Sequence, residues 1–255
     1  MAPARGQDTG LPVLSVAACS PTHPGDLLPR HLSHLSLVAV NIDGVLLNDS
    51  FSPVMRRLVE SRGGTYTSAF ERDLLSQPQL VAAQRAADSL GGTAQQILED
   101  YFAQREEYVR ENPVHMLDGA TELLATLRSL NVRVICYGGL ERAHFTRHLG
   151  DVADHFDDPG YVCTNDFRPG IREITELFGL RHDRVLFIDD VARVAEAARE
   201  LGTPFIGHPG EGGHGYQRQM MEKTGVRHIV GTLRAIDEAL LRRVDAEAAA
   251  GNVWR

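Results

Sequence analysis

The sequence predicts an α/β fold, in which a parallel sheet carries a helical domain inserted near its beginning. Short apolar runs alternate with helical patterns, as is typical of parallel strands joined by helices. About ninety residues separate the first two runs, more than a crossover connection needs. The chain has 255 residues and 43% hydrophobic content, enough for a core domain and a smaller second domain.

Residues 1–34 precede the first strand and are rich in Pro, Gly and Ser. We expect an N-terminal extension that flanks the core as a strand or a loose segment. The apolar run before Cys19 resembles a lipoprotein cleavage site, but it is short for a signal peptide and its leader has little net charge. The three cysteines are widely spaced. A cytoplasmic, reduced protein is therefore expected.

The first strand is expected at residues 37–40, and it runs into a tight turn that carries an amide and a carboxylate. These side chains belong to Asn41 and Asp43, and Gly44 allows the chain to turn sharply after them. Ligands of open α/β sheets bind at the carboxyl ends of the strands. Asn41 and Asp43 are therefore candidate site residues.

Residues 52–114 are predicted to form the inserted helical domain, between core segments 35–51 and 115–255. Gly63-Gly64 and Gly91-Gly92 interrupt its helices. Apolar residues recur at helical spacing: Leu74, Leu75, Leu80, Val81, Ile97, Leu98, Tyr101, Phe102 and Tyr108. Four arginines could each recognise an anion, although a solvated helix face accounts better for any one of them: Arg56, Arg57, Arg85 and Arg105.

Asp118 is the expected N-cap of the helix with which the chain returns to the core. A second buried strand follows at residues 132–137 and ends at Gly138 and Gly139. Backbone N–H groups of such glycines can bind an anion. The hydroxyl of Tyr137 could donate one more hydrogen bond to the same anion.

Charged residues follow the next two segments of the core. Arg168 opens a helical pattern that begins near residue 171. The strand at residues 184–188 ends in Asp189 and Asp190. Two adjacent carboxylates at a buried strand end repel each other unless a cation lies between them, and oxygen ligands suit Mg²⁺.

A short strand at residues 203–206, a glycine-rich loop at 208–216, a strand at 226–230 and a terminal helix complete the predicted core. His208 and His214 lie in the loop. No third metal ligand is near them in the sequence, so a mobile loop at the rim of the sheet is the better interpretation.

The order of these segments resembles the haloacid dehalogenase-like (HAD) superfamily of phosphohydrolases, over residues 36 to about 235. The resemblance implies a Rossmann-like parallel-sheet core with an α-helical cap, as in the subgroup of phosphoglycolate phosphatase and β-phosphoglucomutase. Mg²⁺ would be bound at Asn41, Asp43, Asp189 and Asp190. Asp43 would also act as acid/base, and Arg168 would replace the family's Lys in balancing charge. The implied phosphate contacts are Tyr137, Gly138 and Gly139.

This chain departs from the family pattern at four positions. Asn41 stands where the family has the Asp that attacks phosphorus, and an amide oxygen is a far poorer nucleophile than a carboxylate. Tyr137 and Gly138 replace the usual Ser or Thr and Asn. Arg168 replaces Lys in a chain whose 26 basic residues include a single lysine, Lys223.

Two functions fit this pattern. The favoured one is a Mg²⁺-dependent phosphatase, a phosphoric monoester hydrolase of a small phosphorylated metabolite, which Asn41 inactivates as in an engineered substrate trap. Phosphomutase activity remains open within it. The alternative is a natural pseudo-phosphatase that binds a phosphorylated ligand or a partner protein without hydrolysis. Carbon–phosphorus and carbon–halogen cleavage fit the residues less well.

Nucleic acid and membranes are not expected as partners. The formal net charge is −8, so the chain provides no basic field for a polyanion. No stretch is long and apolar enough to span a bilayer.

Overall fold

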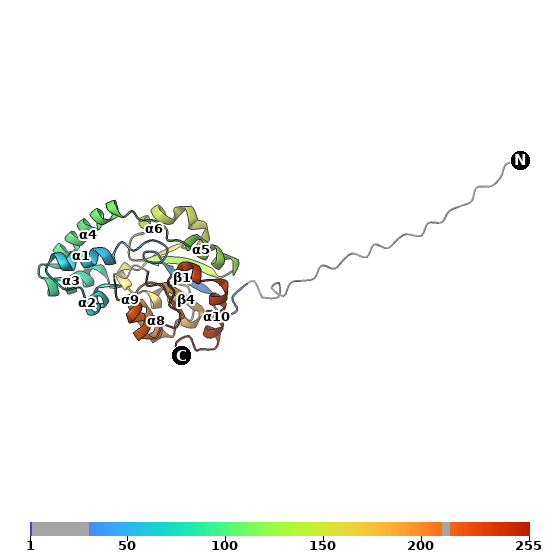
Figure 1. Ribbon diagram of the computed structural model, residues 1–255. Helices are drawn as coiled ribbons and strands as arrows, with labels where there is room; N and C mark the ends of the chain where they lie inside the picture. Colours follow the sequence, from blue (N-terminus) through green and yellow to red (C-terminus); the bar gives the residue numbers. More distant parts are fainter. Residues whose placement is uncertain (2–30, 211–214) are drawn as a thin grey trace.

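A computed structural model describes residue 1, residues 31–210 and residues 215–255, and it contains a parallel-sheet core and a group of cap helices (Figure 1). Most of the predicted extension at 1–34 lies outside the described residues. Its last residues are anchored to the core, because Asp245 accepts hydrogen bonds from the backbone N–H groups of Ser33, His34 and Leu35. No helix among the described residues is long and apolar enough to cross a membrane.

The sheet has five parallel strands in the order β3-β2-β1-β4-β5. Their bounds are Leu37–Asn41 for β1, Arg133–Gly138 for β2, Tyr161–Cys163 for β3, Val185–Asp189 for β4 and Phe205–Gly207 for β5. Every residue of the central strand β1 is buried, as its unbroken apolar sequence predicts. The predicted α/β fold with a parallel sheet and a helical insertion is thus confirmed.

The predicted strand at 226–230 is wrong. Only a single bridge joins Ile229 to Gly207. Its hydrogen bonds are those of the Gly207 N–H to the carbonyl of His228 and of the Val230 N–H to the carbonyl of Gly207. Gly207 is the last residue of the three-residue strand β5, so the ladder has no further partner to extend along.

Helices cover both faces of the sheet. Alternate residues of β1 face opposite sides, so that Val38 and Val40 pack in one cluster while Leu37 and Ala39 pack in the other. The core helices are α5 (Ala120–Ser129), α6 (Arg142–Leu149), α7 (Ile171–Leu177), α8 (Ala192–Leu201), α9 (Gln217–Thr224) and α10 (Glu238–Ala249). Short 3₁₀ helices occur at Gly150–His155, Asn165–Phe167, His182–Arg184 and Leu233–Ala235.

Helix α5 begins differently from the prediction. Its N-cap residue is Gly119, at φ +87°, and not Asp118. The carboxylate of Asp118 instead accepts hydrogen bonds of 2.7 and 2.9 Å from the guanidinium of Arg234. The glycine can adopt this left-handed turn without steric cost, which turns the preceding carboxylate away from the helix start.

Four helices between β1 and β2 form the cap: α1 (Ser52–Ser61), α2 (Ser68–Leu74), α3 (Gln79–Leu90) and α4 (Ala94–Glu111). They gather at one end of the molecule in Figure 1. A capping box between Thr93 and Gln96 starts α4 directly after Gly91-Gly92. The cap has its own apolar cluster, which includes Leu58, Leu74 and Ile97.

Leu80 and Val81 do not belong to this cluster, contrary to the helical pattern assigned from the sequence. Leu80 is 68% exposed and Val81 is 40% exposed. Helix α3 instead buries Ala83, Ala86 and Ala87. Leu80 and Val81 lie in the first turn of α3, ahead of the buried stretch that begins at Ala83.

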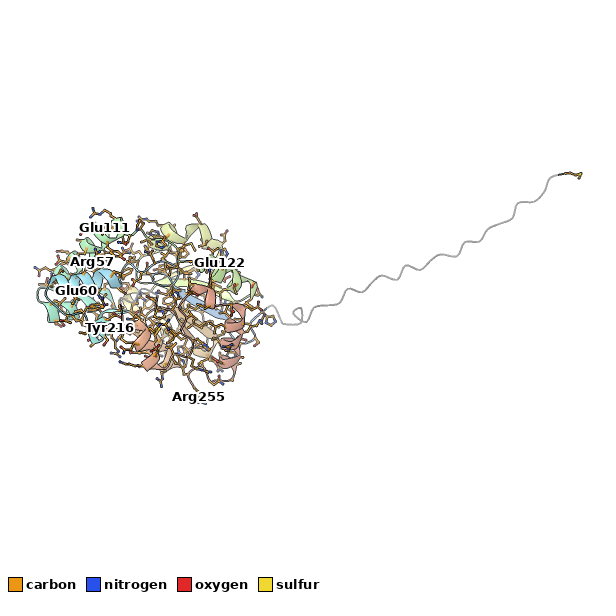
Figure 2. The ribbon with its side chains drawn as sticks, viewed as in Figure 1. Arg57, Glu60, Glu111, Glu122, Tyr216 and Arg255 are labelled. Carbon is orange, nitrogen blue, oxygen red and sulfur yellow. The ribbon has the colours of Figure 1, made fainter. Side chains whose placement is uncertain are left out.

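The cap is joined to the core by a buried carboxylate. Glu71 of α2 is fully buried and accepts hydrogen bonds from the backbone N–H of Tyr216 and from the side-chain amide of Gln217. The rings of Tyr216 and Tyr66 stack with their centroids 6.4 Å apart. Figure 2 shows Tyr216 where the cap meets the core, while Arg57, Glu60 and Glu111 lie on the outer cap surface.

Candidate functional site

The carboxyl ends of β1, β2 and β4 bring the predicted site residues together. Asn41 pairs with Tyr137 across β1 and β2, and Asp189 ends β4 on the other side of β1. Six predicted residues lie at this edge: Asn41, Asp43, Gly139, Asp190 and Arg168 line one cavity, while Asp189 is fully buried behind it.

The side chain of Asn41 ties two oxygens of the site together. Its Nδ2 donates hydrogen bonds to the backbone carbonyl of Asp43 at 2.7 Å and to Oδ1 of Asp190 at 2.9 Å. Asn41 is 4% exposed, and its Oδ1 has no hydrogen-bond partner among the described residues. The two amide hydrogens of Asn41 therefore satisfy the Asp43 carbonyl and Asp190 Oδ1, two acceptors that cannot bond to each other.

The turn after β1 leaves room for the carboxylate of Asp190. Gly44 adopts φ +86°, and a Cβ added there would lie 2.1 Å from Oδ2 of Asp190. A side chain at position 44 is therefore excluded by both backbone conformation and space. Burial and the neighbouring charge of Asp189 raise the pKa of Asp190 well above its ordinary value.

The Tyr137 hydroxyl bonds to Asp189 and is not available to a ligand in the cavity. Its hydroxyl donates a hydrogen bond of 2.5 Å to Oδ2 of Asp189, and Oδ1 of Asp189 accepts from the backbone N–H of Val191 at 2.7 Å. Tyr137 is fully buried, so its single proton is used and the expected bond to a bound anion is not available. Burial raises the pKa of Asp189 to about 6, although the Tyr137 bond lowers it.

Asp43 is paired with a residue that the sequence analysis missed. Nε2 of His144 lies 2.9 Å from Oδ1 of Asp43, and both side chains are 11% exposed. His144 lies in the first turn of α6, the helix that follows β2, so the topology brings it to the same edge of the sheet. Its one signal in the sequence is this position after the second strand. Burial, and secondly His144, lower the pKa of the neighbouring His148.

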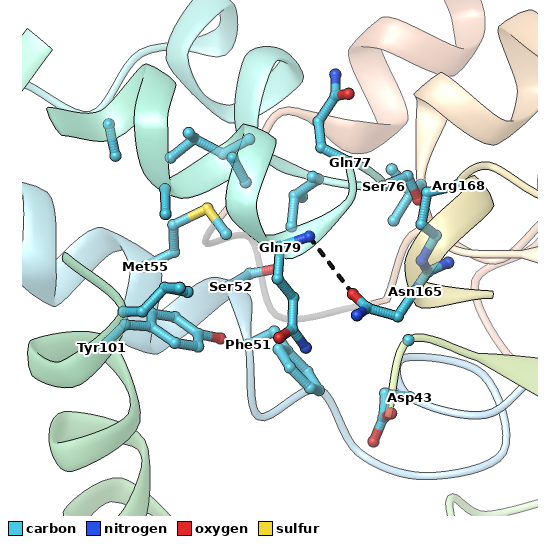
Figure 3. A pocket seen from close by; sticks show the side chains of 18 of the residues that line it. Asp43, Phe51, Ser52, Met55, Ser76, Gln77, Gln79, Tyr101, Asn165 and Arg168 are labelled. Atoms are coloured by element: carbon cyan, nitrogen blue, oxygen red, sulfur yellow. Dashed lines mark hydrogen bonds between the residues drawn. The ribbon is translucent and has the colours of Figure 1, made fainter. Parts of the chain in front are cut away.

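Arg168 lies against the turn after β2. A Cβ added to Gly139 would lie 2.9 Å from Nη2 of Arg168, so the guanidinium rests on the glycine backbone. Gly138 is also confined, because a Cβ there would lie 2.3 Å from Cγ2 of Ile42. Within the described ranges no side chain or backbone group bonds the Arg168 guanidinium, which lines the cavity. Figure 3 shows Arg168 beside Asn165, on the side opposite Tyr101.

His208, which the sequence analysis placed in a rim loop, is buried in the structure. It is 4% exposed, and its Nδ1 lies 3.1 Å from the carbonyl oxygen of Gly44. The histidine therefore packs beneath the turn that carries Asp43. His214 lies outside the described residues.

The cap arginines are held by neighbouring side chains. The guanidinium groups of Arg56, Arg57 and Arg105 lie over the rings of Tyr66, Tyr108 and Phe51 at 5.1, 5.1 and 4.6 Å. Arg85 faces Asp73 at 3.8 Å. None of the four is among the residues found to line the cavity. Arg57 and Arg85 are exposed, as a solvated helix face requires, whereas Arg56 and Arg105 are half-buried.

The arrangement does not fit a resident Mg²⁺ as it stands. Two of the residues that the sequence assigned to the metal, Asp43 and Asp190, each have an oxygen that accepts a hydrogen from Asn41: the Asp43 carbonyl and Asp190 Oδ1. Both oxygens of Asp189 are taken by Tyr137 and Val191. Among the described residues, no group of three or more His, Cys, Asp or Glu side chains is placed to hold a metal.

Comparison with solved structures identifies the fold. A HAD family hydrolase from Deinococcus radiodurans R1, with bound phosphate and sodium, aligns with a TM-score of 0.56 and 17% identity over 85% of this chain and 97% of its own. A haloacid dehalogenase-like protein of unknown function from Agrobacterium tumefaciens gives 0.58 and 18%, over 85% and 98%. A β-phosphoglucomutase from Clostridium difficile gives 0.63 and 15%, over 85% and 99%.

These structures share the fold with this chain at low sequence identity. No protein-family model matches the sequence, and no curated protein matches it either. The chain therefore has a HAD-like hydrolase fold with a helical cap, as its four segments predicted.

Proposed function

We propose that the chain as it stands binds a small phosphorylated molecule at the carboxyl ends of β1 and β2 and does not hydrolyse it. It would thus be a pseudo-phosphatase with a HAD-like fold. The observation that carries this proposal is the double hydrogen bond from Asn41 Nδ2 to the Asp43 carbonyl and to Asp190.

The amide of Asn41 does two things that a carboxylate at position 41 would not do. It supplies hydrogens to two acceptors within 2.9 Å, which a carboxylate would repel unless a cation lay between them. It also removes the anionic nucleophile that attacks phosphorus in this superfamily. These two acceptors therefore have a donor without a metal, and the site lacks the group that would form an aspartyl-phosphate.

Position 41 is not the only departure that supports binding without hydrolysis. At the end of β2, where the superfamily usually presents a small hydroxyl to the phosphate, the Tyr137 hydroxyl is committed to Asp189. A single replacement that traps a substrate would leave the remaining positions unchanged. Two altered positions that are compatible with each other, 41 and 137, favour a site that no longer catalyses hydrolysis.

Arg168 supplies the charge for the proposed ligand. Its guanidinium lines the cavity and no described residue pairs with it. A planar guanidinium forms paired hydrogen bonds with phosphate oxygens. Gly139 lies beside the same guanidinium and lines the cavity, so its backbone N–H is a candidate further donor.

One observation favours a second candidate, a Mg²⁺-dependent phosphatase whose nucleophile is replaced. The pair of Asp43 and His144 keeps a carboxylate in the position of the expected acid/base. An acid/base has no task in a site that only binds. A phosphatase restored by Asn41→Asp would account for it.

The two candidates differ in what Asn41→Asp does. Binding of inorganic phosphate to the unchanged chain would be measured by calorimetry with and without Mg²⁺. Phosphate release from small phosphate monoesters would be measured for the unchanged chain, Asn41→Asp and the control Asn41→Ala. We expect phosphate binding that needs no Mg²⁺, and no release by any of the three.

Mg²⁺-dependent release by Asn41→Asp alone would establish the second candidate. Absence of phosphate binding to the unchanged chain would overturn the first. Thermal denaturation adds an independent readout, because Mg²⁺ should stabilise Asn41→Asp and leave the unchanged chain unaffected.

A further inference from the structure

The cavity at the site continues into the cap. It has a volume of about 150 Å³, with a polar end at the strand ends and an apolar end between α1, α3 and α4. The apolar end is lined by Met55, Leu58, Ala83, Ala86, Ile97 and Leu98. Figure 3 shows Met55 and Tyr101 on one side of the pocket, with Arg168, Asn165 and Asp43 across it.

Small side chains of α3 create the apolar end. Ala83 and Ala86 are 3% and 2% exposed and face α4 where most cores would place a larger residue. A Leu at position 86 would project its side chain into the space that these alanines leave. The whole cavity, polar end included, has about the volume of a core cavity that binds benzene, so its apolar end holds a group no larger than about one aromatic ring.

Polar atoms at the mouth of this cavity lack partners. Asn41 and Ser76 are 4% and 8% exposed, and Asn41 Oδ1 and Ser76 Oγ have no hydrogen-bond partner among the described residues. The Tyr101 hydroxyl is buried and likewise unbonded within the described part of the chain. Burying a polar atom without a partner is unfavourable, and at the polar end a protonated phosphate oxygen of a bound ligand would supply a partner for Asn41 Oδ1.

We infer that the ligand is a phosphate monoester whose organic part is a compact apolar group of about one aromatic ring, seated between α1, α3 and α4. This inference rests on the proposed binding function, because Arg168 and Gly139 would hold its phosphate. A ligand hydroxyl placed against Ala83, Ala86 and Ile97 would be buried without a hydrogen-bond partner, which favours an apolar group at this end of the cavity.

Three probes separate the two ends of the site in the unchanged chain. Inorganic phosphate tests the polar end, benzene tests the apolar end, and phenyl and benzyl phosphate test both together. Calorimetry would measure the phosphates, and thermal denaturation under benzene vapour would detect the ring. We expect the aryl phosphates to bind roughly 10- to 100-fold more tightly than inorganic phosphate, the gain that burial of one aromatic ring provides.

Glycerol phosphate is the matched polar probe, with a similar phosphate and a hydroxylated body. It should bind no more tightly than inorganic phosphate. Naphthyl phosphate should lose the gain of the phenyl ester, because its second ring exceeds the cavity.

Two variants test whether the gain in affinity of the aryl phosphates comes from the apolar end of the cavity. Ala86→Leu fills the apolar end and should weaken phenyl phosphate at least about 10-fold while leaving inorganic phosphate unchanged. Ala103→Leu makes the same substitution on an exposed position of α4 and should change neither affinity. The measurements on the unchanged chain decide the matter even if Ala86→Leu fails to fold.

The failures of the two proposals are distinguishable. If inorganic phosphate binds but neither benzene nor an aryl group adds affinity, the apolar ligand class is wrong and the binding function stands. If benzene binds and no phosphate does, the binding function is wrong and the cavity takes an uncharged ligand.

Discussion

The bond between Tyr137 and Asp189 offers a sharp test of how the site is held together. Tyr137→Phe removes one hydroxyl and keeps the ring, which packs edge-on against Phe187 with centroids 5.5 Å apart. The lost hydrogen bond runs from a fully buried hydroxyl to a fully buried carboxylate at 2.5 Å. Hydrogen bonds to charged groups contribute about 1.5–3 kcal/mol, so we expect a loss of about 2 kcal/mol in the free energy of unfolding.

Tyr161→Phe is the matched control. Its hydroxyl donates to the backbone carbonyl of Leu140 at 2.6 Å, and its ring stacks on Phe145 at 5.3 Å. The substitution removes the same atom from a bond to a neutral acceptor, so a loss of about 1 kcal/mol is expected. Urea denaturation at near-neutral pH measures both losses, and a loss of about 2 kcal/mol corresponds to a fall in Tm of about 4–8 °C.

The pH dependence of this difference carries a definite sign. Burial raises the pKa of Asp189 to about 6 in the folded chain, above its ordinary value of 3.8. A raised acid pKa means that the stability linked to Asp189 is full below the unfolded pKa and is lost as pH rises through the folded pKa. The Tyr137 bond limits that loss, because it favours the charged carboxylate. The cost of Tyr137→Phe should therefore be larger near pH 8 than near pH 5.

Two results would refute this reasoning. If Tyr137→Phe is no more destabilising than Tyr161→Phe, then the bond to Asp189 is not charge-assisted. If the cost of Tyr137→Phe grows as the pH falls, then the hydroxyl stabilises the protonated carboxyl and the assigned direction is wrong.

Three further predictions concern single positions. Gly44→Ala should destabilise the fold by more than about 2 kcal/mol, because its Cβ would lie 2.1 Å from the Asp190 carboxylate; Gly91→Ala, also at positive φ but with nothing within 4 Å, should cost less in the same denaturation assay. Asp245→Asn should cost about 2–3 kcal/mol at neutral pH. Burial raises the pKa of Asp245, but hydrogen bonds, led by that from the Leu35 N–H, lower this pKa overall. The stabilisation that Asp245 provides is therefore present above the pKa of the unfolded state and is lost as pH falls through the pKa of the folded state. Unfolding curves of Asp245→Asn and of the unchanged chain should accordingly converge in acid. Leu80→Gln should change stability by less than about 0.5 kcal/mol in thermal denaturation, since Leu80 is 68% exposed.

The sequence predicted β1, β2, β4 and β5 and the edge at which the site forms, but it did not predict the three-residue strand β3. Unbroken apolar runs before Asn41 and before Asp189 can be buried only as inner strands of a parallel sheet, and both are inner strands in the structure. Since carboxyl ends of parallel strands share one edge, the meeting of Asn41 with Asp190 followed from the same pattern.

Local sequence patterns predicted burial and strand formation less reliably where tertiary contacts decide the outcome. Leu80 and Val81 fit a helical period, but a period does not say which turns of a helix meet a neighbour, and in α3 the buried residues begin only after the first turn. Residues 226–230 have the composition of a strand, but a strand forms only along a partner of sufficient length, and β5 ends at Gly207.

The partners of the site's side chains were decided by the tertiary structure alone. The pairing of Asp43 with His144 joins residues 101 positions apart, and the bond between Tyr137 and Asp189 joins residues 52 apart. Sequence shows which groups are present at the sheet edge, because strand patterns are local. Which donor faces which acceptor depends on how β2, β4 and α6 pack around β1, and packing is a property of the whole fold.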